Sequence, residues 1–158
     1  MEESKKSDNL TLKKDTFISD NHSYSTIIEK ESKPYTIMIV DDIEINLFIL
    51  SELIDSINNK FTIIKCSSGK EATEKFIDTR PDILFLDIYM PSMNGFETAK
   101  VIRDFENKHE LASTPIIALT ADSFSDNDEL NFENLFNDFM KKPIYLKNLS
   151  DSLNRYLF

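Results

Sequence analysis

The sequence is poor in several residue types, and each shortage excludes a class of protein. Its 158 residues include one cysteine, two glycines and no tryptophan. A single cysteine excludes a disulfide framework within the chain, and a reducing, intracellular environment is the simplest interpretation. Because Cys66 lies in the apolar stretch FTIIKC, we expect a buried and inert thiol rather than a reactive one.

Long apolar runs are also missing. The N-terminus, MEESKKSDNLTLKK, has no apolar core of the kind found in a signal peptide, and no apolar run approaches the roughly 18 residues of a membrane span. We therefore expect a soluble, cytoplasmic protein. Basic residues are fewer than acidic ones, 18 against 28, and the formal charge is −10. This balance argues against nucleic acid or an anionic membrane as the main partner, and it fits a basic protein partner or a bound cation.

The character of the chain changes near Pro34. Residues 1–34 are mostly polar or charged, show no sustained hydrophobic period, and are predicted to form a flexible N-terminal tail. Residues 35–158 have the pattern of one globular domain. Short apolar runs within them predict five strands, at 35–40, 61–66, 82–86, 115–119 and 135–140.

Helical patterns lie between these runs. Apolar residues recur at steps of three and four over 43–57 and 146–156, which predicts two amphipathic helices. Weaker patterns begin at Gly69 and Gly95, and residues 123–133 predict a short fourth helix. Five strands that alternate with five helices indicate an α/β fold in which helices cover both faces of a parallel sheet. Ligands of such sheets bind at the carboxyl edge of the strands.

Chemically useful side chains follow four of the five predicted strands. Asp41 and Asp42 follow the first strand, Asp87 the third, Thr120 the fourth and Lys142 the fifth. Polar residues often end strands as turns or caps, which explains any one of these positions. It explains less well why three carboxylates, a hydroxyl and a lysine should converge on one edge.

The chemistry open to this group follows from its parts. Neighbouring carboxylates repel unless a cation neutralises them, and an oxygen-only cluster suits Mg²⁺. No set of His and Cys residues has the spacing of a zinc site. A carboxylate beside Mg²⁺ can attack phosphorus and carry the phosphoryl group as an acyl phosphate. The charge on the transferring oxygens then needs a fixed cation and a hydrogen-bond donor, for which Lys142 and Thr120 are the candidates.

Four motifs together resemble a known family. The stretches IMIVDD (37–42), LFLDIYMPSMNG (84–95), IIALTAD (116–122) and FMKKP (139–143) are similar, in order and spacing, to the receiver domain of two-component response regulators. The resemblance covers residues 35–158. The stretches VDDIEIN and MPSMNG are most similar to those of receivers in hybrid kinases and phosphorelays. It implies a flavodoxin-like, doubly wound sheet with the strand order 2-1-3-4-5.

The resemblance also implies which residues receive phosphate and bind metal. Asp87 is the implied phosphoacceptor. Asp42 is expected to bind Mg²⁺ directly, and Asp41 directly or through water. Asp87 itself and the backbone carbonyl of Tyr89 complete the implied metal ligands.

Further roles are implied around the phosphoryl group. Thr120 and Lys142 would hold its oxygens, and Lys142 is preferred to Lys141 because the family's lysine directly precedes a proline. A cis peptide bond is expected before Pro143. Phe139 occupies the position of the aromatic switch residue.

One stretch departs from the family pattern. The family often has a glycine in the turn before its last strand, whereas NFENLFNDF has none. We therefore expect Asn134 or Asn137 to adopt the left-handed backbone conformation that a glycine would otherwise supply.

The implied function is signalling rather than enzymatic. We expect a stand-alone receiver, since the chain stops at Phe158 where the last helix ends, that takes phosphate from a histidine kinase or a histidine phosphotransfer protein. The output surface is expected on the fourth and fifth helices and the fifth strand, facing an unidentified protein target. Two alternatives stay open: a shuttle that passes phosphate onward, and a docking module that is never phosphorylated. An enzyme of small phosphorylated molecules is disfavoured, because the sequence supplies neither a general acid nor a substrate cap.

Overall fold

A five-stranded parallel sheet forms the centre of the domain that the structure describes. The structure, a computed structural model, describes residues 34–121 and 132–158. The strands are β1 (Thr36–Val40), β2 (Thr62–Cys66), β3 (Ile83–Asp87), β4 (Ile116–Thr120) and β5 (Asp138–Lys141). They pair in parallel in the order β2-β1-β3-β4-β5. The predicted α/β class and strand order are confirmed.

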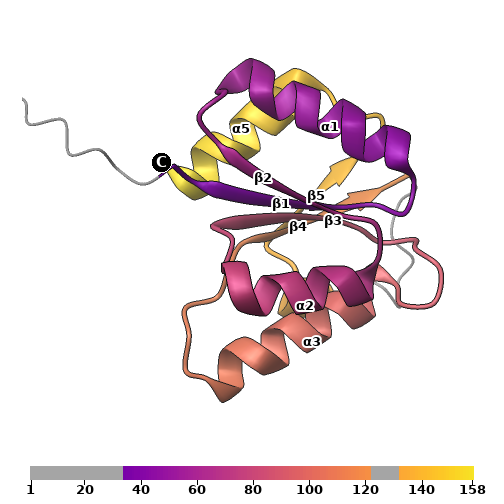
Figure 1. Cartoon of the computed structure of the whole chain (residues 1–158), viewed down its shortest axis with the longest axis vertical. Helices are drawn as coiled ribbons and strands as arrows, with labels where there is room; N and C mark the ends of the chain where they lie inside the picture. The colour runs from indigo at the N-terminus through magenta and orange to yellow at the C-terminus, as the bar shows by residue number, and fades with distance from the viewer. Residues whose placement is uncertain (1–33, 122–131) are drawn as a thin grey trace, which may run out of the picture. The chain divides into compact units, whose positions relative to one another are not determined.

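Helices cover both faces of the sheet. Helices α1 (Glu44–Ile57) and α5 (Leu146–Leu157) pack on one face, and α2 (Gly69–Thr79) and α3 (Gly95–Lys108) on the other (Figure 1). Each helix lies within three residues of its predicted range. Residues 132–135 are also helical, but most of the fourth predicted helix, 123–133, lies outside the described residues. So does the predicted tail, apart from Pro34.

The three central strands are buried along their whole length. Every residue of β1, β3 and β4 is buried, which explains their unbroken apolar runs. Alternate residues of β1 point to opposite faces of the sheet and belong to two different cores. Ile37 and Ile39 pack beneath α1 and α5, whereas Met38 and Val40 pack against α2 and α3. Cys66 belongs to the second core and is 1% exposed, as predicted. Polar residues that follow these strands therefore stand on rigid backbone.

The last strand begins later than predicted. It starts at Asp138, whereas the apolar run suggested residue 135. Leu135 still belongs to the helical residues, and Phe136 is buried in the core beneath α2 and α3. The run is apolar because the helical residues before the turn and strand β5 each bury part of it. The length of the run therefore did not indicate the length of the strand.

The turn before β5 also differs from expectation. Neither Asn134 nor Asn137 has a positive φ, so the predicted left-handed residue was wrong. Instead, the side chain of Asn137 organises the turn: its Oδ1 accepts hydrogen bonds from Ile116 N–H (2.8 Å) and from the guanidinium of Arg103 (2.9 Å). Arg103 also donates to the carbonyl of Leu135 at 3.1 Å. Side-chain hydrogen bonds therefore replace the conformational freedom of a glycine here.

The start of α3 is locked against the end of β3. Asn94 and Glu97 form a reciprocal capping box, in which each side chain accepts a hydrogen bond from the backbone N–H of the other. The next residue, Gly95, comes so close to β3 that a Cβ there would lie 2.5 Å from the carbonyl oxygen of Asp87. This close approach requires glycine, and it holds the backbone of Asp87 in place.

Two further features bear on the predictions. The Lys142–Pro143 peptide bond is cis, as the resemblance implied. Among the helices within residues 34–121 and 132–158, none is both long and apolar enough to cross a membrane.

Candidate functional site

Lys142 joins two carboxylates that follow different strands. Its Nζ lies 2.6 Å from Asp41 Oδ2 and 3.1 Å from Asp87 Oδ2. Both carboxylates are almost fully buried, with 2% of Asp41 and 5% of Asp87 exposed. Burial of two like charges this close is unfavourable unless a cation lies between them, and the lysine supplies it. The predicted convergence of strand ends is therefore observed for these three residues.

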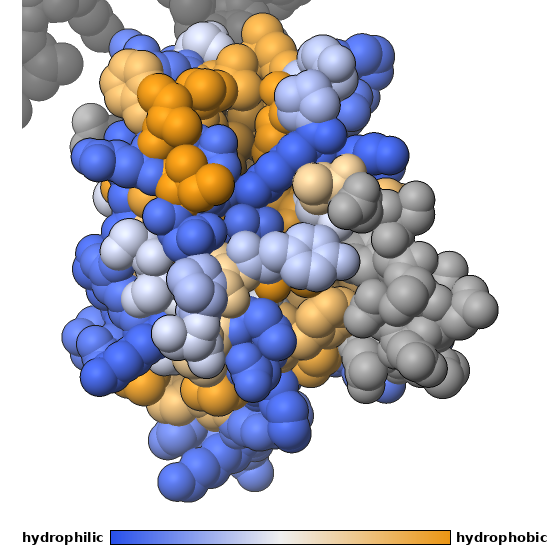
Figure 2. Space-filling view, turned by 90° about the vertical axis from the view of Figure 1, so that its right-hand side faces the viewer, coloured by the Kyte–Doolittle hydropathy of each residue, from blue (hydrophilic) through white to orange (hydrophobic). Residues whose placement is uncertain are grey.

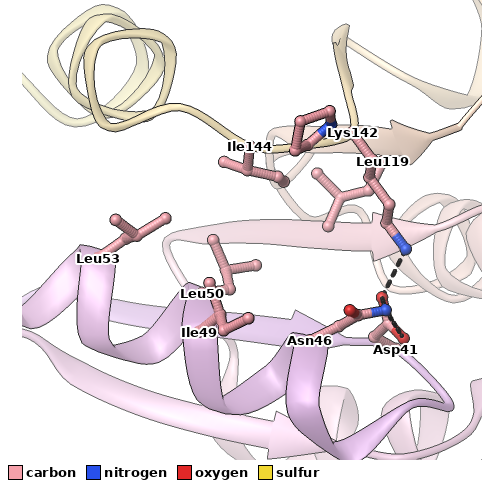
Figure 3. A pocket seen from close by; sticks show the side chains of 9 residues that line it. Asp41, Asn46, Ile49, Leu50, Leu53, Leu119, Lys142 and Ile144 are labelled. Carbon is pink, nitrogen blue, oxygen red and sulfur yellow. Dashed lines mark hydrogen bonds and ion pairs between the residues drawn. The ribbon is translucent and has the colours of Figure 1, made fainter.

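Asp41 is held by two further donors besides the lysine. The backbone N–H of Ile43 donates to Oδ1 at 2.9 Å, and the side-chain amide of Asn46 lies 3.0 Å from Oδ1 and 3.1 Å from Oδ2. Figure 3 shows Asn46 reaching from α1 toward Asp41, with Lys142 approaching from the opposite side. The carboxylate of Asp41 is therefore fixed in orientation.

Asn46 was not among the residues predicted from the sequence. The prediction considered only the residues that follow each strand, and Asn46 lies one helical turn further on, inside α1. A signal did exist: Asn46 is the uncharged polar residue in the stretch IEIN, which lies directly after the two aspartates. Its role depends on α1 turning back over Asp41, which the tertiary structure decides.

The third carboxylate completes an acidic cluster. Oxygen atoms of Asp41, Asp42 and Asp87 all lie within 4.8 Å of one another. Asp42 is exposed, whereas the other two are buried, so the cluster opens to solvent on the side of Asp42. All donors are hard oxygens, and a cluster of few carboxylates with an open side suits Mg²⁺, which retains several waters.

The surroundings of Asp87 oppose its ionisation. Burial raises the pKa of its carboxyl group above the usual range, although the charge and hydrogen bond of Lys142 act in the opposite direction. For the amino group of Lys142, burial acts to lower the pKa, but the hydrogen bond to Asp41 and the charges of both carboxylates raise it overall. The lysine therefore stays charged, and an additional cation would further stabilise the ionised carboxylates of the cluster.

The remaining predicted site residues lie on the same edge or beside it. Thr120 ends β4 and is buried, and the strand register places it one residue beyond the partner of Asp87. Tyr89 is 57% exposed, and its N–H lies 3.4 Å from Asp87 Oδ1. Phe139, on β5, is 54% exposed, with its ring 6.0 Å from that of Phe132.

Comparison with known families decides what this arrangement is. The model of the response regulator receiver domain matches residues 37–154. The chain belongs to the response regulator receiver domain family. Receivers are signalling domains of two-component systems, so the predicted signalling class is confirmed.

Relatives of this receiver fall into two groups. It is 35% identical over 120 residues to hybrid signal transduction histidine kinase A of Dictyostelium discoideum, an alignment that covers 75% of this chain and 6% of that protein. It is 30% identical over 122 residues to the polar-differentiation response regulator DivK of Brucella ovis, which covers 77% of this chain and 95% of that protein. The chain thus spans only a small part of the hybrid kinases it matches.

Solved receivers share the fold. The receiver domain of the yeast response regulator Ssk1, crystallised with the histidine phosphotransfer protein Ypd1 of Saccharomyces cerevisiae, superposes with a TM-score of 0.70 at 30% identity, covering 78% of this chain and 89% of that one. The receiver domain of a sensor histidine kinase from Pseudomonas aeruginosa has a TM-score of 0.68 at 25% identity, covering 78% of this chain and 98% of that one. That structure has a magnesium ion coordinated in its active site cleft.

Proposed function

We propose that this receiver, formed by residues 35–158, takes a phosphoryl group from a phosphohistidine of a partner protein onto Asp87. The observation that carries the proposal is the placement of Asp87: its carboxylate ends a central strand, is contacted by Lys142 at 3.1 Å, and belongs to a three-carboxylate cluster. A nucleophile in a transfer reaction must be held still at an accessible edge. The end of β3 meets that requirement.

The transfer is a displacement at phosphorus. A carboxylate oxygen of Asp87 attacks the phosphorus atom, an O–P bond forms, and the P–N bond to the donor's imidazole breaks with its electron pair returning to nitrogen. The product is an acyl phosphate on Asp87. Lys142, which contacts Asp87 at 3.1 Å, would neutralise the incoming phosphoryl oxygens, and Thr120 is the proposed hydroxyl donor.

The residues present fit a magnesium ion. Asp41, Asp42 and Asp87 would hold it with the backbone carbonyl of Tyr89, as three carboxylates within 4.8 Å supply hard oxygen ligands. When bound, Mg²⁺ would supply the positive charge that lets carboxylates and phosphoryl oxygens come together. The hydrogen bonds from Asn46 and Ile43 would fix Asp41 in its ligating orientation.

Phosphorylation would change a protein-binding surface. We propose that Thr120 moves toward the phosphoryl group and that Phe139, now 54% exposed, turns inward. Exposed apolar residues Tyr145 and Leu146 lie nearby in the sequence, at the start of α5. The surface of β5 and α5 would thus differ between the two states and select a downstream protein. The chain assists only its own phosphorylation and dephosphorylation, and it acts in the cytoplasm.

One experiment tests the acceptor. Acetyl phosphate, a donor that needs no partner protein, is added with Mg²⁺ to the wild-type chain and to the variants Asp87→Asn and Asp78→Asn. Asp78 is an exposed aspartate of α2 and serves as the matched control. Intact mass should show one added phosphoryl group on the wild-type chain and on Asp78→Asn, and none on Asp87→Asn. Labelling of Asp87→Asn would refute the assignment.

A phosphate shuttle is the second candidate. Receivers of hybrid kinases are among its relatives, and the Ssk1 receiver was crystallised with a histidine phosphotransfer protein. Mixing the phosphorylated chain with unphosphorylated Ypd1 would distinguish the two: loss of phosphate to Ypd1 supports a shuttle, and release as inorganic phosphate supports a terminal receiver.

A further inference from the structure

Four phenylalanine rings form a connected series between α3 and β5. Phe96 meets Phe136 edge to face, with the ring centroids 5.4 Å apart. Phe136 stacks on Phe132 at 5.1 Å, and Phe132 meets Phe139 edge to face at 6.0 Å. Phe139 is the exposed aromatic residue of β5 that the proposed switch turns inward. The series therefore links the start of α3 to the switch residue.

The end of the series away from Phe139 is firmly held. Phe96 directly follows Gly95, whose close approach to β3 fixes the start of α3. Phe136 is 5% exposed and belongs to the core beneath α2 and α3, and both Phe96 and Phe132 pack against that core. Phe132 therefore presents its ring to Phe139 from a supported position.

The strand register shows where the ring of Phe139 would turn. Phe139 pairs with Ala118 of β4, and Ala118 belongs to the core beneath α2 and α3. Residues two apart on a strand share a face of the sheet, so Thr120 lies on this face too, closer to the phosphoacceptor. Ala118 has the smallest side chain in β4, so of the positions on this strand it leaves the most space for an incoming ring.

We propose that Phe132 holds Phe139 outward in the unphosphorylated receiver, so that the inward turn over Ala118 must break the contact between their rings. The inference rests on the proposed function, to which the inward turn belongs. Edge-to-face aromatic pairs stabilise a structure beyond the apolar area that they bury. Because the outward position alone has this contact, the contact lowers the fraction of the inward form in the absence of phosphate. Phe132 is thus a positioning residue that acts through Phe139.

Beryllofluoride, a phosphoryl analogue, provides the test. With Mg²⁺ it occupies the place of the phosphoryl group on Asp87, which it reaches at the carboxyl edge of the strands, a face where hydrophilic side chains predominate (Figure 2). The apparent affinity of a ligand rises with the fraction of the protein that is in the form that binds it. Phe132→Leu, which keeps an apolar side chain but removes the ring, should therefore lower the half-saturating concentration of beryllofluoride by about two- to tenfold. The amide NMR signals of Thr120 and Phe139 measure the saturation.

Phe105→Leu is the matched control. Phe105 is partly buried against the same core and also forms an edge-to-face pair, with Phe76 at 6.5 Å, but it lies toward the other end of α3. This variant should need the wild-type concentration of beryllofluoride, and so should Phe132→Tyr, which keeps the ring. An unchanged or higher half-saturating concentration for Phe132→Leu overturns the proposal. So does an equal fall for Phe105→Leu, because general loss of core packing would then explain both.

Failure of this inference and failure of the proposed function give different results. If beryllofluoride saturates no form, wild type included, the acceptor role of Asp87 fails. Urea unfolding of Phe132→Leu, Phe139→Leu and the double variant then judges the ring contact by itself. The unfolding equilibrium constant of the double variant should rise less than the two single effects combined predict, by a factor of about two or more. Independent effects would show that the rings do not stabilise each other, and they would overturn the proposal.

Discussion

Lys142 and Asp41 form an ion pair at 2.6 Å although 101 residues separate them in the chain. The pair spans the sheet between the ends of β1 and β5, and the lysine reaches Asp87 at the same time. The cation thus holds together two carboxylates that would otherwise repel in a buried position. The site is organised around this lysine, and three of the predictions below concern the lysine itself or residues that support its two partners.

Replacing Lys142 should alter the pKa and the phosphorylation of Asp87 more than it alters the fold. In Lys142→Met the positive charge that lowers the pKa of Asp87 is gone, so that pKa should rise further above its usual range. Labelling by acetyl phosphate should fall by more than about tenfold, since a fixed cation at the transferring group is lost. NMR titration of the Asp87 carboxyl carbon and intact mass measure the two effects. Lys141→Met, which removes the exposed neighbour, should leave both unchanged, and an equal loss there would contradict the choice of Lys142.

Removing Asn46 should weaken the binding of Mg²⁺ rather than the fold. Asn46→Ala deletes the amide that contacts both oxygens of Asp41, leaving this carboxylate less well oriented. Calorimetric titration with Mg²⁺ should give an affinity about tenfold lower, in the range typical for loss of an outer-shell partner. Asn107→Ala, an exposed position in α3, is the control. A variant with full Mg²⁺ affinity would show that Asn46 does not position Asp41.

Gly95 should tolerate no side chain. In Gly95→Ala the new Cβ would lie 2.5 Å from the carbonyl oxygen of Asp87 and 2.8 Å from Cα of Ile88, so backbone must shift. Overpacking of this kind costs about 1–3 kcal/mol in free energy of unfolding. Urea unfolding measures the loss, with Lys100→Ala in the same helix as the control. Because the shift reaches Asp87, labelling by acetyl phosphate should also be slower; unchanged stability would show that α3 can move away.

Cys66 should make stability depend on pH in the alkaline range. Burial raises the pKa of its thiol from 9.0 to about 11, so the unfolded chain releases this proton at lower pH than the folded one. The stabilising effect of the buried neutral thiol is present below pH 9 and is lost as the pH rises toward 11. By about pH 11 the loss should reach about 2 kcal/mol. Urea unfolding of wild type and Cys66→Ala across this range isolates the effect, because groups that do not interact with Cys66 contribute the same pH dependence in both chains.

The same burial predicts how Cys66 behaves toward reagents. At neutral pH the native chain should resist alkylation by iodoacetamide, whereas the chain in denaturing urea should react readily. Rapid modification of the native chain would contradict the burial of this residue.

The architecture could be predicted from the sequence because it depends on local patterns. Each central strand is buried on both faces, so its apolar run is unbroken, and α1 is apolar at the steps that face the sheet. The pattern failed at residues 135–137, where an apolar run was shared between a helix end and a turn. The prediction also failed at Asn137. The turn there is stabilised by hydrogen bonds of the Asn137 side chain and not by a left-handed backbone conformation.

For the site, the sequence by itself determined which chemical groups stand at the strand ends: the aspartates, the threonine and the lysine. Parallel strands all end at one edge, so their convergence followed from topology. Only the tertiary structure decided that Lys142 contacts both Asp41 and Asp87, that Asn46 turns back to hold Asp41, and that a pocket opens between α1 and Ile144. Those contacts depend on how the helices pack on the sheet. A shift of a few ångströms between residues far apart in the chain determines which side chains come into contact.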